Sequence, residues 1–143
     1  MGSCCVADLI PFERGVIHHR ERAQQIVDFS GLCFGTITPT DIDGLIEYRN
    51  RCFLFVEFKH VSKPEIDDGQ RLALERMARG LRKPTFVLHA VHNVPSHVDI
   101  DAAGALVHRL YLNWKPEWRP PDRLITVREA AEWFFEAKGS PRI

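Results

Sequence analysis

The middle of the chain consists of two largely apolar runs separated by a short polar break, a pattern that predicts a β-hairpin. One run covers residues 42–48 and the other covers residues 52–59, with the polar turn Arg49-Asn50-Arg51 between them. The second run begins Cys-Phe-Leu-Phe-Val, with no polar position. A strand with one face in water alternates apolar and polar residues, so this strand is expected to be covered on both faces.

Three other stretches have the apolar spacing of helices. They cover residues 16–29, 62–81 and 126–138. Ser30-Gly31 offers a stop for the first of them, and the other two begin with capping boxes. The capping-box pairs are Ser62 with Glu65 and Thr126 with Glu129. The apolar stripe of the second helix consists of Ile66, Leu74, Met77 and Leu81.

The remaining strands follow from runs of branched and aromatic residues. Residues 85–91 predict a second buried strand, and residues 105–114 predict another. Residues 35–41 enter the first strand of the hairpin, where Pro39 permits only an edge or a lead-in. Residues 115–121 are rich in proline and are expected to form a surface loop.

The order of these elements is helix, two hairpin strands, helix, strand, strand, helix. It predicts an α/β or α+β layered fold, in which a central mixed β-sheet is flanked by helices. The length of 143 residues is typical of one domain, so residues 1–143 are expected to form a single unit. Residues 1–15 are expected to be a loose lead-in to it.

Composition limits which cellular compartment and which kinds of partner are expected. The formal net charge is zero, which argues against the broad basic surface of a non-specific DNA-binding protein but leaves room for a local basic groove. The sequence has no apolar run long enough to span a membrane and no basic segment of a signal peptide near its start, so no membrane partner is expected. The four cysteines lack the spacing of a metal finger or a disulfide framework, as expected for a cytoplasmic protein.

Candidate chemistry lies at the end of the second hairpin strand, where Glu57 and Lys59 point to the same face. A turn centred near Arg49-Asn50 places Asp43 opposite Val56 or Glu57, and cross-strand Cβ atoms lie about 4.5–5.5 Å apart. Two carboxylates and a lysine on neighbouring strands form a suitable site for a hard divalent cation. The alternative is a solvated ion pair at the end of a surface hairpin.

The same residues carry a family resemblance. Asp43-Gly44, followed after a hairpin by Glu57-Phe58-Lys59, resembles the PD-(D/E)XK nuclease superfamily. The segment that leads into the pair, Thr-Pro-Thr-Asp-Ile-Asp-Gly at residues 38–44, is similar to small members from phage and mobile elements. The resemblance implies a restriction-endonuclease-like core and the hydrolysis of phosphodiester bonds in DNA with Mg²⁺ or Mn²⁺. It leaves open whether the protein acts as a homodimer.

The resemblance also implies roles for individual residues. Asp43 and Glu57 would supply oxygen ligands to the metal, joined by the Phe58 carbonyl. Lys59 would orient the attacking water or offset charge on the phosphate. Gln70, on the helix after the acid-X-Lys strand, would position water or phosphate.

Alternatives stay open for three acidic or polar residues near this site. Gln70 interrupts the apolar stripe of its helix on the inward side, where the other interpretation is a glutamine bonded to backbone or lying at the rim. Glu21, on the first helix, either approaches the metal or faces water. Asp41 shares a face with Asp43 if the strand has already begun, so it is the second choice for the metal ligand.

Other functions compete with a nuclease. A nuclease-like fold that has lost catalysis and serves as a nucleic-acid-binding or protein-binding regulator is compatible with the neutral charge. A zinc site at the histidines is disfavoured, because His89 and His92 face opposite ways on an extended segment. Trp114 and Trp118, mixed with Lys115 and Arg119, have a composition found where single strands are held, or they belong to a surface loop.

Overall fold

A computed structural model describes residue 21 and residues 24–138. Contacts within the chain divide it at Pro39–Thr40 into two units, which are described separately. The expectations of a loose lead-in at residues 1–15 and of a helix over most of residues 16–23 lie outside the described residues. The expectation of one domain over the whole chain stays a prediction.

In the first unit, the predicted helix does not continue through residues 24–29, where the prediction is wrong. A 3₁₀ turn, η1 (Ser30–Leu32), forms just beyond. Asp28 Oδ1 accepts hydrogen bonds from the backbone N and the Oγ of Ser30, at 3.0 and 2.7 Å. Such a local side-chain turn competes with helical hydrogen bonding. Ile26 and Val27 are 73% and 78% exposed, so their apolar stripe gains nothing from burial that would favour a helix.

In the second unit, five strands form one mixed sheet in the order β1-β2-β3-β4-β5. Strands β2 and β3 are parallel, and the other neighbouring pairs are antiparallel. The strands are β1 (Gly44–Tyr48), β2 (Cys52–His60), β3 (Thr85–His92), β4 (Leu106–Leu112) and β5 (Lys115–Arg119). The first four lie where the apolar runs predict them. The last is a strand rather than the expected surface loop, because Leu110 and Leu112 of β4 offer it an edge to pair with.

The hairpin of β1 and β2 turns at the expected residues. Arg49 and Asn50 both have positive φ, at 46° and 56°, and the Arg51 N–H donates to the Tyr48 carbonyl. This left-handed geometry matches the twist of the two strands. It also determines which residues of β1 and β2 stand opposite each other.

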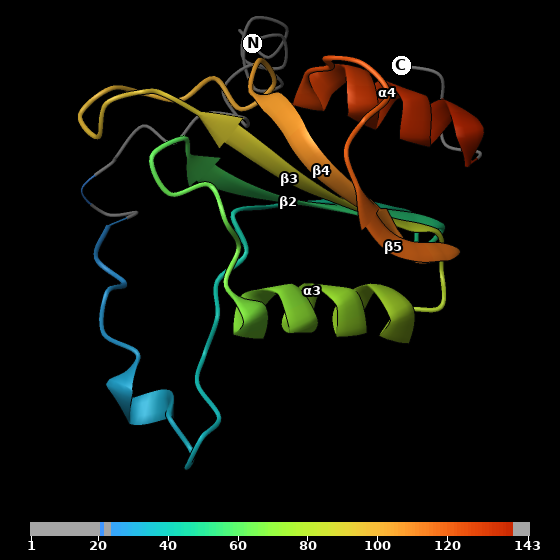
Figure 1. Cartoon of the computed structure of the whole chain (residues 1–143). Coiled ribbons are helices and arrows are strands. Elements are labelled where there is room, and N and C mark those ends of the chain that lie inside the picture. Colours follow the sequence, from blue (N-terminus) through green and yellow to red (C-terminus); the bar gives the residue numbers. More distant parts are fainter. Residues whose placement is uncertain (1–20, 22–23, 139–143) are drawn as a thin grey trace, which may run out of the picture. The chain divides into compact units, whose positions relative to one another are not determined.

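Two helices cover the sheet from opposite faces (Figure 1). Helix α3 (Asp68–Gly80) begins later than predicted, with Asp67 as its N-cap. Ser62 is not the cap because its hydroxyl lies 2.7 Å from His60 Nδ1. Helix α4 (Val127–Ala137) begins with the predicted capping box of Thr126 and Glu129.

Each face of the sheet has its own apolar layer. Toward α3, Phe55, Val87 and Tyr111 pack with Leu74 and Ala78 of the helix. The layer toward α4 is larger and includes Leu54, Phe86, Leu88, Leu112, Ala131 and Phe134. The predicted fold class, a central mixed sheet flanked by helices, is therefore confirmed. Among the residues that the structure describes, no helix is long and apolar enough to cross a membrane.

Candidate active site

Strand β2 carries Glu57 into the interior on the face that α3 covers. Side chains alternate along a strand, so Glu57 and Lys59 point to the same face as Phe55, which packs against α3. Glu57 is only 3% exposed. Its Oε1 lies 3.2 Å from Lys59 Nζ, but its Oε2 is buried without a hydrogen-bond partner among the described residues. A buried carboxylate with one free oxygen is costly and indicates a missing partner.

Asp43 stands beside Glu57, as the hairpin predicts. Gly44 pairs with Val56, so the next step of the register places Asp43 opposite Glu57. Asp43 itself is exposed. Its Oδ2 accepts a hydrogen bond of 2.8 Å from the Phe58 backbone N–H. The carbonyl of a strand residue points to the same side as its N–H, so the Phe58 carbonyl also faces the Asp43 side.

Helix α3 supplies Gln70, which is 5% exposed. The Asp67 cap accepts a 2.8 Å hydrogen bond from the Gln70 backbone N–H and so places this residue in the first turn. The Gln70 Oε1 atom is buried without a partner. Gln70 therefore lies inside the protein, next to Glu57, and the alternative of a glutamine at an exposed rim is excluded.

The charges of this cluster act on Glu57. Burial raises the pKa of the Glu57 carboxyl above its usual value, and the neighbouring Asp43 carboxylate raises the pKa further. Hydrogen bonding from Gln70 and Lys59 lowers the pKa and offsets part of this rise. Ionising Glu57 beside Asp43 is therefore unfavourable, and a nearby cation would relieve the cost.

The donor set fits a hard divalent cation. Asp43, Glu57 and the Phe58 carbonyl offer oxygen atoms, and Glu57 Oε2 lacks a partner. No group of three histidine, cysteine, aspartate or glutamate side chains that could hold a metal occurs in the part of the chain that the structure describes. Mg²⁺ commonly takes one or two carboxylates and completes its shell with water and substrate phosphate, so two carboxylates are compatible with it.

Of the two secondary candidates, Asp41 does not join this cluster on the observed contacts. Glu57 interacts with Asp43, Lys59 and Gln70, and Asp41 is absent from its neighbours. Asp41 and Asp43 do not share a strand face, because the strand begins only at Gly44. Glu21 belongs to the other unit, so its role stays a prediction.

Sequence reasoning missed a polar row beside the acids. In the register of the sheet, Glu57 pairs with His89 on β3, and His89 pairs with Arg109 on β4. His89 is 4% exposed, and its Nε2 has no hydrogen-bond partner. Burial, followed by the charge of His108, lowers the pKa of His89 to about 4. The signal in the sequence was a histidine, His89, between the apolar neighbours Leu88 and Ala90 in the middle of β3.

The histidines form no metal centre among the described residues. The His92 ring packs edge-on against the His60 ring, with centroids 5.3 Å apart. The His89 ring instead lies 5.0 Å from the His108 ring, in a similar arrangement. His89 and His92 therefore have different neighbours, as their spacing on a strand predicts.

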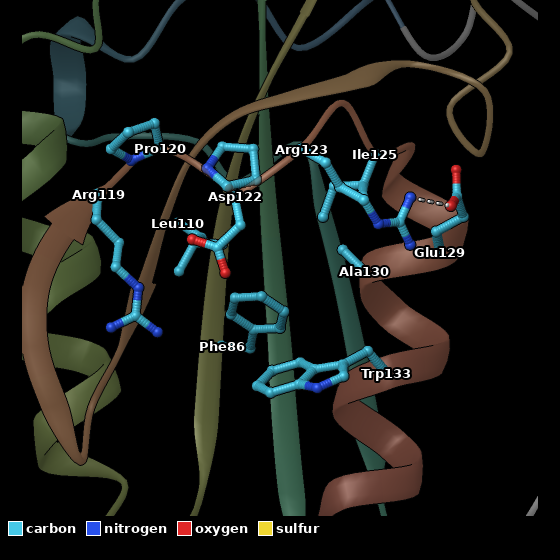
Figure 2. Close-up of a pocket in the computed structure, with 11 residues that line it drawn as sticks. Phe86, Leu110, Arg119, Pro120, Asp122, Arg123, Ile125, Glu129, Ala130 and Trp133 are labelled. Atoms are coloured by element: carbon cyan, nitrogen blue, oxygen red, sulfur yellow. Dashed lines mark hydrogen bonds and ion pairs between the residues drawn. The ribbon is translucent and has the colours of Figure 1, made fainter.

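A separate hollow of about 270 Å³ lies on the α4 face (Figure 2). Phe86 and Trp133 form its apolar floor, and Arg119 and Arg123 stand on opposite sides. The Arg123 guanidinium is 3.3 Å from the Glu129 carboxylate. Because the sheet separates this hollow from Glu57, it is not part of the acidic cluster.

Comparison with known protein families, with curated proteins and with solved structures finds no match to this chain. The function is therefore inferred from the geometry of the acidic cluster and from the sequence resemblance.

Proposed function

We propose that this protein is a Mg²⁺-dependent or Mn²⁺-dependent nuclease that hydrolyses phosphodiester bonds in DNA. The observation that carries the proposal is the buried Glu57 carboxylate, which has a free oxygen, a second carboxylate opposite it and a lysine on the same strand face. The resemblance of Asp43-Gly44 and Glu57-Phe58-Lys59 to the PD-(D/E)XK superfamily supports the same conclusion.

Each residue of the cluster has a role that follows from its position. Asp43 and Glu57 hold the cation, with the Phe58 carbonyl on the same side. When bound, the cation supplies an activated water and neutralises charge on the scissile phosphate. Lys59, which lies 3.2 Å from Glu57, orients that water or offsets the charge that develops on the phosphate. Gln70 holds water through its free Oε1, which accepts a hydrogen bond, or phosphate through its amide N–H groups, which donate.

A cleavage assay tests this proposal. Supercoiled, single-stranded and branched DNA are incubated with Mg²⁺, with Mn²⁺ and with EDTA. We expect cleavage with either metal, none in EDTA, and none with Asp43→Asn. Asp122→Asn is the matched control, because Asp122 is an exposed aspartate on the α4 face. Cleavage that persists in EDTA or in Asp43→Asn would refute the assignment.

A second candidate function is a regulator that binds nucleic acid or protein without cutting. One observation favours it: Asp43 already accepts a hydrogen bond from Phe58 N, and Glu57 already contacts Lys59, so both acids have structural partners. Binding of DNA without cleavage in any metal, together with unchanged binding in Asp43→Asn, would favour this function over the nuclease.

A further inference from the structure

A second hollow opens on the α3 face, directly beside the acidic cluster. It encloses about 560 Å³ and is bounded by residues from α3, β3, β4 and β5 and by the segment before α3. His89 and Arg109 both line it, and they continue the row that begins with Asp43 and Glu57. Whatever occupies this hollow therefore lies next to the group held at Glu57.

A β-bulge shapes the floor of the hollow. Ala90 pairs with Val107 and His89 pairs with Arg109, so His108 is an extra residue in β4. Val107 is buried toward α4, whereas the His108 ring packs against the His89 ring. The bulge thus brings two consecutive polar side chains, His108 and Arg109, to the same hollow.

His89, which lines this hollow, has an unused hydrogen-bond acceptor. Its ring is hydrogen-bonded to the backbone of Pro64, which has only a carbonyl to offer, so the ring must donate. Because Nε2 has no partner, the donor is Nδ1–H. In this tautomer Nε2 carries a lone pair. A buried acceptor of this kind is satisfied by an N–H or O–H group of a ligand.

The walls supply a cation and an aromatic surface. Arg109 is exposed and has no ion pair within the described residues. Glu75 holds two other lining residues together: Arg71 Nη1 lies 3.1 Å from its carboxylate, and Trp118 Nε1 donates to it at 3.0 Å. Glu65 adds one carboxylate to the lining. The hollow therefore combines a free cation, a neutral acceptor, an acid and an indole ring.

We propose that this hollow binds one unpaired nucleotide of the nucleic-acid substrate, adjacent to the phosphodiester held at Asp43 and Glu57. Arg109 contacts its phosphate, His89 Nε2 accepts a hydrogen bond from its base, and the base lies against Trp118. This inference rests on the proposed function for the identity of the substrate. An indole ring beside a free cation is typical of sites that hold unpaired nucleotides, so the substrate class is single-stranded, frayed or branched DNA.

Binding in EDTA tests the hollow without any cleavage. The probe is a fluorescein-labelled single strand of eight mixed nucleotides, and a hairpin duplex of the same composition is the comparison. Fluorescence anisotropy should show about tenfold tighter binding of the single strand. Equal affinity for the two forms would overturn the proposal.

Substitution of Arg109 tests the proposed contact with the phosphate. Arg109→Gln should weaken single-strand binding about tenfold, as the loss of a charge-assisted contact predicts. Arg76→Gln, an exposed arginine on α3 that does not line the hollow, is the matched control and should change binding less than twofold. If the two variants bind alike, the hollow does not hold the phosphate and the proposal is wrong.

His89→Phe removes the acceptor and keeps a ring of similar size. It should weaken binding of the single strand about tenfold, whereas His89→Gln, which retains an acceptor, should restore most of the affinity. If His89→Phe does not fold, the comparison of His89→Gln with Arg109→Gln still tests the prediction, because only the arginine variant should bind weakly. Unchanged binding in folded His89→Phe would overturn the base contact and with it the proposal.

The two proposals can fail separately. If no DNA is cleaved but single-strand binding depends on Arg109 and His89, the nuclease proposal is wrong and the proposal of nucleotide binding in the hollow is supported. If DNA is cleaved but these variants bind and cut single strands as the wild type does, the proposal of nucleotide binding in the hollow is wrong and the nuclease proposal is supported.

Discussion

At the scale of single residues, the cluster is a balance between like charges and one lysine. Glu57 is buried, Asp43 lies opposite it, and Lys59 contacts only one of its oxygens. One cation cannot neutralise two carboxylates, so the cluster without metal is electrostatically strained. Its members should therefore respond differently to mutation according to whether they hold the metal or act on the substrate.

Lys59→Met separates these roles, because methionine keeps much of the volume of the lysine stem and removes the charge. We expect cleavage to be lost while Mn²⁺ affinity stays within about tenfold, roughly 1.4 kcal/mol. Isothermal titration of Mn²⁺ measures this, with Asp43→Asn as the comparison. If Lys59→Met loses metal binding as completely as Asp43→Asn does, Lys59 is a structural partner of the acids.

Glu57→Gln tests the strain through the pH dependence of stability. The native pKa of Glu57 is raised above its usual 4.5, so the native state binds this proton more tightly than the unfolded state does. The stability that this provides is complete below about pH 4.5 and is lost as pH rises through the native pKa. In EDTA, Glu57→Gln should therefore melt at or above the wild-type temperature at pH 7.5, with the difference shifting in favour of wild type toward pH 4.5.

Near neutral pH, Mn²⁺ should raise the melting temperature of the wild type above that of Glu57→Gln. A ligand at about 100 times its dissociation constant stabilises the native state by roughly 2.7 kcal/mol, a gain expected for the wild type and not for Glu57→Gln. Thermal melts of both proteins in EDTA and in Mn²⁺ provide the measurement. A variant that melts well below wild type in EDTA at pH 7.5 would identify Glu57 as a satisfied structural acid paired with Lys59.

At the scale of elements, the hairpin positions the acids through the close packing of its strands. A Cβ atom at Gly44 would lie 2.7 Å from Val56 Cγ1, so only glycine lets β1 approach β2 this closely without a shift. The residue on either side of this contact is an acid of the cluster: Asp43 precedes Gly44, and Glu57 follows Val56. The backbone approach and the spacing of the acids therefore depend on each other.

Gly44→Ala should disturb both the close approach of the two strands and the spacing of the acids. Overpacking of this kind costs about 1–3 kcal/mol, and the shift should also weaken Mn²⁺ binding. Gly80→Ala is the control, because a Cβ there meets no atom and alanine is the better helix former at the end of α3. Chemical denaturation and Mn²⁺ titration of the two variants measure the effects. Stability equal to wild type in Gly44→Ala would show that β1 can move away without cost.

At the scale of the molecule, all members of the cluster lie in the unit that begins at Thr40. Asp43, Glu57, Lys59 and Gln70 come from the hairpin and from α3, and their observed partners lie in the same unit. The one candidate from the preceding unit is Glu21. The boundary at Pro39–Thr40 therefore gives a direct test of that residue and of the expectation of one domain.

A fragment of residues 40–143 should unfold in one cooperative transition and bind Mn²⁺ within about tenfold of the full chain. Glu21→Gln in the full chain is the companion variant and should likewise retain the affinity. Calorimetry and Mn²⁺ titration measure both. A fragment that does not fold would support one domain over the whole chain, and a full-length Glu21→Gln that loses metal would place Glu21 in the site.

Local pattern was sufficient to predict the hairpin, the acidic pair and the inward position of Gln70. Strand alternation, helical spacing and a turn built on Arg49 and Asn50 act between near neighbours, and such interactions can be followed from the sequence alone. The capping box at Thr126 was predictable for the same reason. The start of α3 was not, because His60 and Asp67 compete with Ser62 for the local hydrogen bonds.

The polar row and the hollow beside it were decided only by the tertiary structure. The parallel pairing of β2 with β3 joins segments separated by α3, and the bulge in β4 sets which residues face His89. Strand β5 likewise exists because β4 presents an edge to it. Hydrogen-bond partners and register across a sheet are chosen between distant segments, where packing rather than local periodicity determines the outcome. The sequence therefore determined the two acids at one end of the hairpin, and the fold determined which side chains stand beside them.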